Sequence, residues 1–126
     1  MARILIVEDD PACLELAVRI VRLEHHESTT ALDGETALAL ARKIHPDAIL
    51  LDLHIPKVDG WTVVKQLRRE KWAAHVPVIA VSASATLPEQ EHALRAGCDE
   101  FLPKPFYPEQ LRAMLDKHLK HTPVTP

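Results

Sequence analysis

Polar side chains of the types used in phosphoryl transfer follow short apolar runs at several points of this sequence. Glu8 and Asp9 follow the first run, Asp52 and Ser82 follow two later ones, and Lys104 comes just after another. Three carboxylates brought together repel one another and need a cation, and oxygen ligands favour Mg²⁺ or Mn²⁺ over zinc. A metal beside a hydroxyl and an ammonium group suits phosphoryl transfer, because together they neutralise the transferred oxygens. One carboxylate could serve as the nucleophile and form an aspartyl phosphate.

The apolar runs that carry these residues predict strands buried on both faces. Residues 4–7, 48–51 and 78–81 are continuous apolar runs without polar alternation, which is typical of strands in a parallel sheet covered by helices. Weaker strands are predicted near residues 27–30 and 99–102. The chemistry-bearing residues therefore stand at or just beyond the carboxyl ends of predicted strands.

Helical patterns separate the strands. Apolar residues recur at three- and four-residue spacing after residue 11, over 34–44, around 61–67, over 88–96 and over 111–119. Local signals agree with these bounds: Asp10 precedes a proline at the first helical position, and Thr86 and Glu89 have the spacing of a capping box. Gly97 predicts a left-handed end to the fourth helix. Asp10 and Asp59 are interpreted as cap and turn residues and not as ligands.

Strand and helix alternate five times, which predicts an α/β fold with a doubly wound five-stranded parallel sheet and five helices. The carboxyl ends of parallel strands meet at one edge, and open sheets of this kind bind ligands there. We therefore expect Asp52 to deliver its side chain into a cleft at that edge.

Composition narrows the class of protein further. The chain has 126 residues, a length that suits one domain, and a net charge of −3, which does not favour nucleic-acid binding. No apolar stretch approaches the roughly 20 residues that a membrane helix needs, and the first residues do not resemble a signal peptide. Two cysteines make no disulfide framework, so we expect a cytoplasmic protein with reduced thiols. Residues 1–120 are predicted to form the domain and 121–126 a flexible tail.

Four segments, ILIVEDD, LLDLHIPKVDG, AVSAS and FLPKPF, carry a family resemblance by their order and spacing. Over residues 2–120 the chain resembles the receiver domain of two-component response regulators, the CheY-like group. The resemblance implies a flavodoxin-like strand order of 2-1-3-4-5. It also implies that Asp52 is the phosphoacceptor, and that Glu8 and Asp9 form the acidic pair that holds Mg²⁺. Asp52 and the backbone carbonyl of His54 would complete the metal site.

The remaining implied roles concern the phosphoryl group and the switch. Ser82 would contact the phosphoryl group and Lys104 would bond to it across the cleft. The Lys104–Pro105 peptide would be cis, and Phe101 matches the aromatic switch position. The side chains of His54 and Ser84 are candidates for tuning the lifetime of the phosphate. For each of these residues, an ordinary packing or surface role is the alternative.

We therefore expect a single-domain response regulator that is phosphorylated by a histidine kinase or a histidine phosphotransfer protein. It would catalyse only its own phosphorylation and dephosphorylation, act on a downstream protein target as a monomer or weak homodimer, and contact neither nucleic acid nor membrane. Alternatives are a receiver excised from a hybrid kinase and a phosphorylation-independent pseudo-receiver. A haloacid-dehalogenase-type phosphatase would need an acid two residues after its nucleophile, where this chain has His54.

Overall fold

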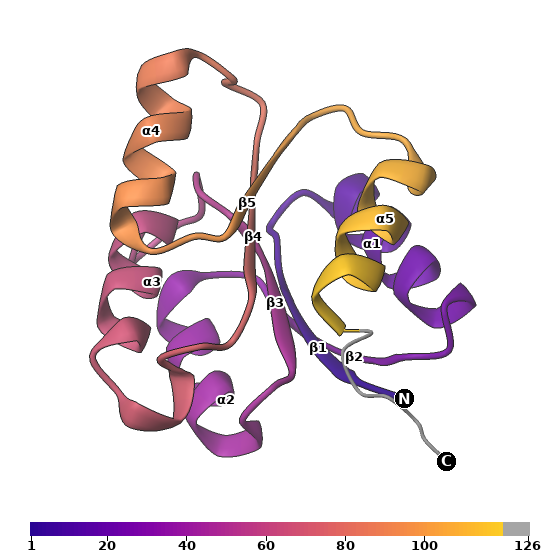
Figure 1. Ribbon diagram of the computed structural model, residues 1–126, viewed down its shortest axis with the longest axis horizontal. Helices are drawn as coiled ribbons and strands as arrows, with labels where there is room; N and C mark the ends of the chain where they lie inside the picture. The colour runs from indigo at the N-terminus through magenta and orange to yellow at the C-terminus, as the bar shows by residue number, and fades with distance from the viewer. Residues whose placement is uncertain (120–126) are drawn as a thin grey trace.

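The computed structural model describes residues 1–119, which form three layers (Figure 1). A parallel sheet lies in the middle, with α1 and α5 on one face and α2, α3 and α4 on the other. The elements follow in the order β1 (Arg3–Val7), α1 (Pro11–Leu23), β2 (Glu27–Ala31), α2 (Gly34–Ile44), β3 (Ala48–Asp52), α3 (Gly60–Arg68), the short 3₁₀ helix η1 (Lys71–Ala73), β4 (Val78–Ser82), α4 (Leu87–Ala96), β5 (Glu100–Pro103) and α5 (Pro108–Leu119).

The sheet has the strand order β2-β1-β3-β4-β5 with all neighbours parallel, which confirms the predicted doubly wound fold. The chain leaves β1 toward β2 on one side and later returns to place β3 on the other. The order of strands therefore reverses between β1 and β3, which is where open sheets of this kind form their binding crevice. Glu8 follows β1 and Asp52 ends β3, so both lie at this crevice.

The sheet divides the core into two clusters of buried side chains. Leu5 and Val7 pack with residues of α2, α3 and α4, whereas Ile4 and Ile6 pack with residues of α1 and α5. Because successive side chains of a strand point to opposite faces, every position of a central strand meets a helix layer. This explains why the strands are apolar without alternation, as in the fully buried β3 and β4.

Most of the predicted elements are confirmed, with small shifts at their ends. β2 continues to Ala31, β5 runs from Glu100 to Pro103, and α4 begins at Leu87. Gly97 follows α4 with a φ of 122°, as predicted for a left-handed helix end. Helix η1 was not predicted, because three residues are too few for an apolar period to show.

The predicted capping box at α4 is half wrong. The side chain of Thr86 accepts a hydrogen bond from the backbone N–H of Glu89 at 3.3 Å, as expected of a cap. The reciprocal bond of a capping box would run from the Glu89 side chain back to Thr86. The Glu89 carboxylate instead reaches toward β4, where it accepts a hydrogen bond from Ser82. This hydrogen bond depends on where α4 lies over the sheet, and the spacing of residues along the sequence does not predict that position.

None of the helices within residues 1–119 is long and apolar enough to cross a membrane. The predicted tail, residues 121–126, lies outside the described part of the chain, as does the last residue of the predicted domain.

Candidate functional site at the carboxyl edge of the sheet

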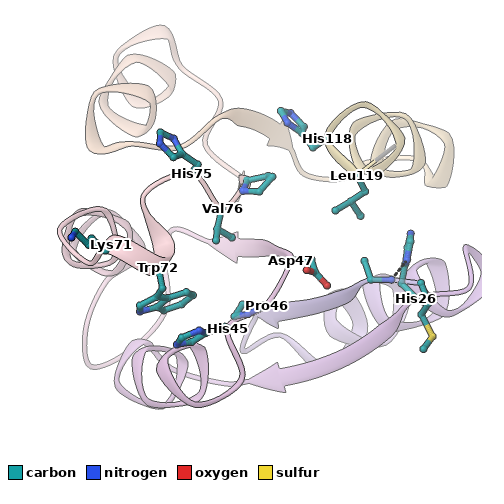
Figure 2. A pocket seen from close by; sticks show the side chains of 13 residues that line it. His26, His45, Pro46, Asp47, Lys71, Trp72, His75, Val76, His118 and Leu119 are labelled. Carbon is teal, nitrogen blue, oxygen red and sulfur yellow. Dashed lines mark hydrogen bonds between the residues drawn. The ribbon is translucent and has the colours of Figure 1, made fainter. Parts of the chain in front are cut away.

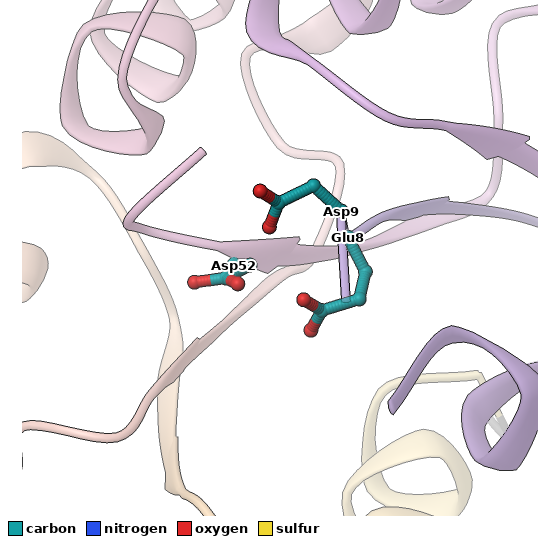
Figure 3. A group of neighbouring side chains, drawn as sticks. All are labelled: Glu8, Asp9 and Asp52. Carbon is teal, nitrogen blue, oxygen red and sulfur yellow. The ribbon is translucent and has the colours of Figure 1, made fainter. Parts of the chain in front are cut away.

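Glu8, Asp9 and Asp52 form an acidic cluster at the carboxyl edge of the sheet (Figure 3). Each offers a carboxylate oxygen, and these oxygens lie within 4.8 Å of one another. Glu8 and Asp52 are buried, with 5% of each residue exposed, whereas Asp9 is exposed. The backbone N–H of Glu8 donates to the carbonyl of Ala31 at 3.0 Å, so the pairing with β2 fixes the start of the cluster.

Lys104 supplies a positive charge to this cluster. Its ammonium lies 2.9 Å from Glu8 Oε1 and 3.1 Å from Asp52 Oδ2, and only 15% of its side chain is exposed. Burial alone would lower the pKa of Lys104, but the bonds to the two carboxylates outweigh it and raise the pKa above its ordinary value. The backbone N–H of Lys104 donates to the carbonyl of Ser82 at 2.8 Å, and the Lys104–Pro105 peptide is cis.

The cluster still carries more negative than positive charge. Burial raises the pKa of Glu8, and the nearby Asp52 carboxylate raises it further, while Lys104 and the Asp10 backbone N–H oppose the rise. The donor set consists of carboxylate oxygens alone, which are the hard ligands that Mg²⁺ prefers. The residues present therefore fit a divalent cation of this kind.

The loop after β3 is held against Asp52. The backbone N–H of His54 donates to Asp52 Oδ1 at 2.9 Å, so the two carboxylate oxygens have different partners, the loop for one and Lys104 for the other. The contact made by His54 is thus through its N–H. The role of its carbonyl as a metal ligand stays a prediction.

Ser82 ends β4 beside Asp52 and is fully buried. In the sheet register Asp52 faces Val81, so Ser82 stands one residue beyond the acid on the neighbouring strand. Its hydroxyl donates to Glu89 Oε2 at 2.5 Å and accepts from the backbone N–H of Ser84 at 3.0 Å. The structure therefore places Ser82 at the site, but with its proton directed to α4. The tuning role predicted for Ser84 stays a prediction.

Glu89 is the site residue that the sequence analysis missed. Its Oε2 also lies 2.9 Å from Nε2 of His54, and its side chain is 14% exposed. The spacing from Thr86 pointed to a local cap, so the sequence offered another explanation for this acid. The signal that remains is its place in the first turn of the helix that follows β4, because that turn lies at the carboxyl edge of the sheet.

An aromatic chain continues from His54 to α4. The His54 ring meets Trp61 edge-on, with 5.2 Å between ring centroids, and Trp61 stacks on His92 of α4 at 4.9 Å. The loop after β3, helix α3 and helix α4 are therefore joined by side chains beside the acidic cluster. Phe101, the predicted switch residue, is half-buried on β5 and packs against the core cluster shared with α2, α3 and α4.

Asp10 is a helix cap, as predicted, and Asp59, which was predicted to be a turn residue, is a helix cap as well. The carboxylate of Asp10 accepts from the backbone N–H of Cys13 at 2.9 Å, and that of Asp59 accepts from Thr62 at 2.8 Å. Each side chain therefore satisfies the start of its own helix, α1 or α3. Both cysteines of the chain are free.

A pocket of about 860 Å³ lies at the opposite edge of the sheet (Figure 2). His26, His45, His75 and His118 line it together with Trp72, on which His45 stacks at 4.2 Å between ring centroids. Among residues 1–119, its lining shares no residue with the acidic cluster. The size of this cavity is thus no guide to where the chemistry lies, because the cluster at the other edge holds the carboxylates, the lysine and the hydroxyl.

Comparison with known proteins agrees with this geometry. Residues 4–116 match the response regulator receiver domain family, and the chain belongs to that family. It is 36% identical over 102 residues to the polar-differentiation response regulator DivK of Brucella ovis, covering 81% of this chain and 83% of DivK. It is 37% identical over 126 residues to the DNA-binding dual master transcriptional regulator RpaA of Synechocystis, covering the whole of this chain but 52% of RpaA. The chain thus spans about half the length of that relative.

Solved structures show the same likeness. Chemotaxis protein CheY4 of Vibrio cholerae has a TM-score of 0.89 at 28% identity, covering 94% of this chain and 99% of the other. The receiver domain of a sensor histidine kinase of Pseudomonas aeruginosa, with a magnesium ion coordinated in its active-site cleft, has a TM-score of 0.88 at 31% identity, covering 94% and 98%. Receiver domains bind Mg²⁺ at an acidic pocket and interact with histidine kinases or phosphotransfer proteins. This chain is a receiver domain homologous to single-domain response regulators.

Proposed function

We propose that Asp52 accepts a phosphoryl group from a phosphohistidine of a histidine kinase or phosphotransfer protein. The observation that carries the proposal is the position of its buried carboxylate, which bonds to the Lys104 ammonium and lies beside the carboxylates of Glu8 and Asp9 at the reversal of strand order. A carboxylate held among fixed charges can attack phosphorus without a prior rearrangement of the surrounding solvent.

In this step the phosphoryl group passes from an imidazole nitrogen of the donor to a carboxylate oxygen of Asp52. An oxygen of Asp52 forms a bond to phosphorus while the bond from phosphorus to the donor imidazole nitrogen breaks, and that nitrogen keeps the electron pair. The product is a mixed anhydride, an aspartyl phosphate. Attack by water later breaks the bond between phosphorus and oxygen, and returns the free carboxylate and inorganic phosphate. On this account the chain catalyses only its own phosphorylation and dephosphorylation.

The residues around Asp52 have distinct parts in this step. Mg²⁺ held by Glu8, Asp9 and Asp52 would supply positive charge against the phosphoryl oxygens. Lys104 already bonds to Asp52 Oδ2, and its flexible stem lets the ammonium follow an oxygen that joins phosphorus. Its charge then offsets the negative charge that the transferred group brings.

The response at the surface is the second part of the proposal. Ser82 would donate to the phosphoryl group, and Phe101 would repack as the loops at the carboxyl edge draw in. A downstream protein target in the cytoplasm would bind the changed surface. The chain would act as a monomer or weak homodimer and would not bind nucleic acid. Family membership and the exposed, thinly anchored α4, which buries Ala93 and Ala96, support a change of the surface at this helix.

The test is intact mass spectrometry after incubation with acetyl phosphate and Mg²⁺. The mass should rise by one phosphoryl group, and chelation of the metal should prevent the rise. Asp52→Asn should abolish labelling, whereas Asp59→Asn in the same loop should leave it intact, because Asn caps a helix as well as Asp does. Undiminished labelling of Asp52→Asn would contradict the assignment. Absence of labelling in the unchanged protein would favour a phosphorylation-independent binding module.

A further inference from the structure

The carboxylate of Glu89 bridges the two sides of the phosphoacceptor cleft. It belongs to the first turn of α4, yet its Oε2 accepts from the Ser82 hydroxyl at 2.5 Å and lies 2.9 Å from Nε2 of His54. Ser82 is fully buried and the Glu89 side chain is 14% exposed, so solvent has little access to the bond between them. A hydrogen bond to a charged acceptor in such surroundings is among the stronger ones in proteins.

The Ser82 hydroxyl has no second proton to offer. A serine hydroxyl donates one hydrogen bond and can accept two, and this one already accepts from the Ser84 backbone N–H. While it donates to Glu89, it cannot donate to a phosphoryl oxygen on Asp52. The two acceptors are therefore mutually exclusive partners of the same proton.

Charge makes the competition stronger. Burial raises the pKa of Glu89, but the hydrogen bonds from Ser82 and His54 outweigh it, and the net pKa is lowered, so this group is a carboxylate at neutral pH. A phosphoryl group on Asp52 would bring further negative charge next to Ser82, which stands one residue beyond Asp52 in the register of β3 and β4. Two anions near one donor repel each other as well as compete for it.

We propose that Glu89 is a positioning residue that competes with the phosphoryl group for the Ser82 hydroxyl and so opposes phosphorylation. The inference rests on the proposed function of Asp52 and names a residue that governs it. The bond between Glu89 and Ser82 stabilises the unphosphorylated state, and it must break before Ser82 can bind the phosphoryl group. Because Glu89 belongs to α4, the same event removes a bond that ties this helix to β4.

His54 holds Glu89 in the competing position. Its ring also meets Trp61 edge-on, and Nε2 presents a partner to Glu89 from the loop after β3. Release of Glu89 thus removes the direct bond between the helix and that loop as well as the bond to β4. Phosphorylation of Asp52 and a shift of α4 would therefore both follow from breaking the contact between Glu89 and Ser82.

The experiment compares Glu89→Gln and Glu89→Ala with Glu91→Gln. Gln keeps the shape of the side chain and an acceptor oxygen but loses the charge, whereas Ala removes the acceptor. Glu91 is two residues further along α4 and exposed, so its replacement removes the same charge without touching Ser82. The backbone N–H of Glu89 that Thr86 caps is present in all variants, so the helix start is unchanged. Thermal unfolding of each variant checks that it is folded.

The probe is beryllofluoride with Mg²⁺, which mimics a phosphoryl group on an aspartate, titrated by tryptophan fluorescence and paired with the rate of labelling by acetyl phosphate. Loss of a hydrogen bond to a charged group predicts about tenfold to a hundredfold tighter binding for Glu89→Gln and at least as much for Glu89→Ala. Faster labelling should accompany it. A merely structural role for Glu89 predicts lower stability and no gain in affinity.

Two outcomes would overturn the inference without touching the proposed function. Both Glu89 variants could bind beryllofluoride no more tightly than the unchanged protein, or Glu91→Gln could show the same gain, which would make the effect one of net charge. If the unchanged protein takes no label from acetyl phosphate, the proposed function of Asp52 fails first, and the inference fails with it.

Discussion

Two half-buried cations, Lys104 and Arg68, organise opposite edges of the sheet in different ways. Lys104 is 15% exposed and bonds to carboxylates, those of Glu8 and Asp52. Arg68 is 19% exposed and pairs with a single carboxylate, that of Asp99, at 2.9 Å. The rest of its guanidinium donates to backbone carbonyls of the segments around η1 and after α4, which are those of Gly97 at 2.8 and 3.0 Å, Ala73 at 2.8 Å and Val76 at 2.7 Å.

The difference shows how one fold separates stability from chemistry. A guanidinium is a planar fork of donors that is always charged, and at Arg68 these donors bond to backbone carbonyls and to one carboxylate, acceptors that the fold holds in fixed positions. An ammonium on a flexible stem is a point charge that can pass from one oxygen to another. The acids around Lys104 outnumber it, so that edge remains ready for a further cation and the opposite edge does not.

Arg68→Ala gives the largest effect that this comparison predicts. Loss of the guanidinium removes the donor to the half-buried carbonyls of Gly97 and Val76 and leaves Asp99 without its cation, so the free energy of unfolding should fall by about 3 kcal/mol. Urea denaturation measures the fall, and labelling by acetyl phosphate should persist while the variant is folded. Arg69→Ala, at an exposed neighbour, should change stability by less than about 0.5 kcal/mol. Equal losses of stability in the two variants would mean that the hydrogen bonds of Arg68 do not stabilise this edge of the sheet.

Lys104→Met tests the carboxyl edge of the sheet and should change the affinity of the acidic cluster for Mg²⁺. Without the ammonium, Glu8, Asp9 and Asp52 face one another unopposed, and Mg²⁺ binding should tighten by roughly tenfold. Labelling by acetyl phosphate should nevertheless slow, because the charge that follows the phosphoryl oxygen is gone. Isothermal titration with Mg²⁺ and intact mass spectrometry give the two readouts. Weaker Mg²⁺ binding would mean that Lys104 positions the acids instead of competing with the metal.

Glu100→Gln has the smallest predicted effect, and it depends on pH. The hydrogen bond from Lys117, followed by that from His118, lowers the pKa of Glu100 below its ordinary value of 4.5. A carboxyl group with a depressed pKa contributes stability above its unfolded pKa and loses it as pH falls through the folded pKa. Glu100→Gln should therefore cost less than about 1 kcal/mol at pH 7, since Lys117 is mostly in solvent, and progressively less below pH 4.5. Urea unfolding at pH 7 and pH 3 checks this, with the exposed Glu109→Gln as control.

The sequence predicts the sheet and the residues at its carboxyl edge well, because both depend on local patterns. A buried strand that ends in a polar residue is visible in a few consecutive residues, as at Asp52 and Ser82. The roles of Arg68 and Glu89 depend on segments far away in the chain, up to 31 residues for Arg68 and 35 for Glu89. Before the fold is known, Arg68 resembles any basic residue near a helix end, and Glu89 resembles a cap.

The division of the core by the sheet has a consequence for how substitutions combine. Leu5 and Ile4 are neighbours in the chain, yet they lie in separate clusters on opposite faces. The two clusters have no residue in common, and changes at sites without shared partners generally add independently. A damaging change beneath α1 and α5 is therefore not rescued by repacking beneath α2, α3 and α4. During evolution each layer can vary at its own pace, while both must keep the strand ends that hold Asp52 and Ser82 in register.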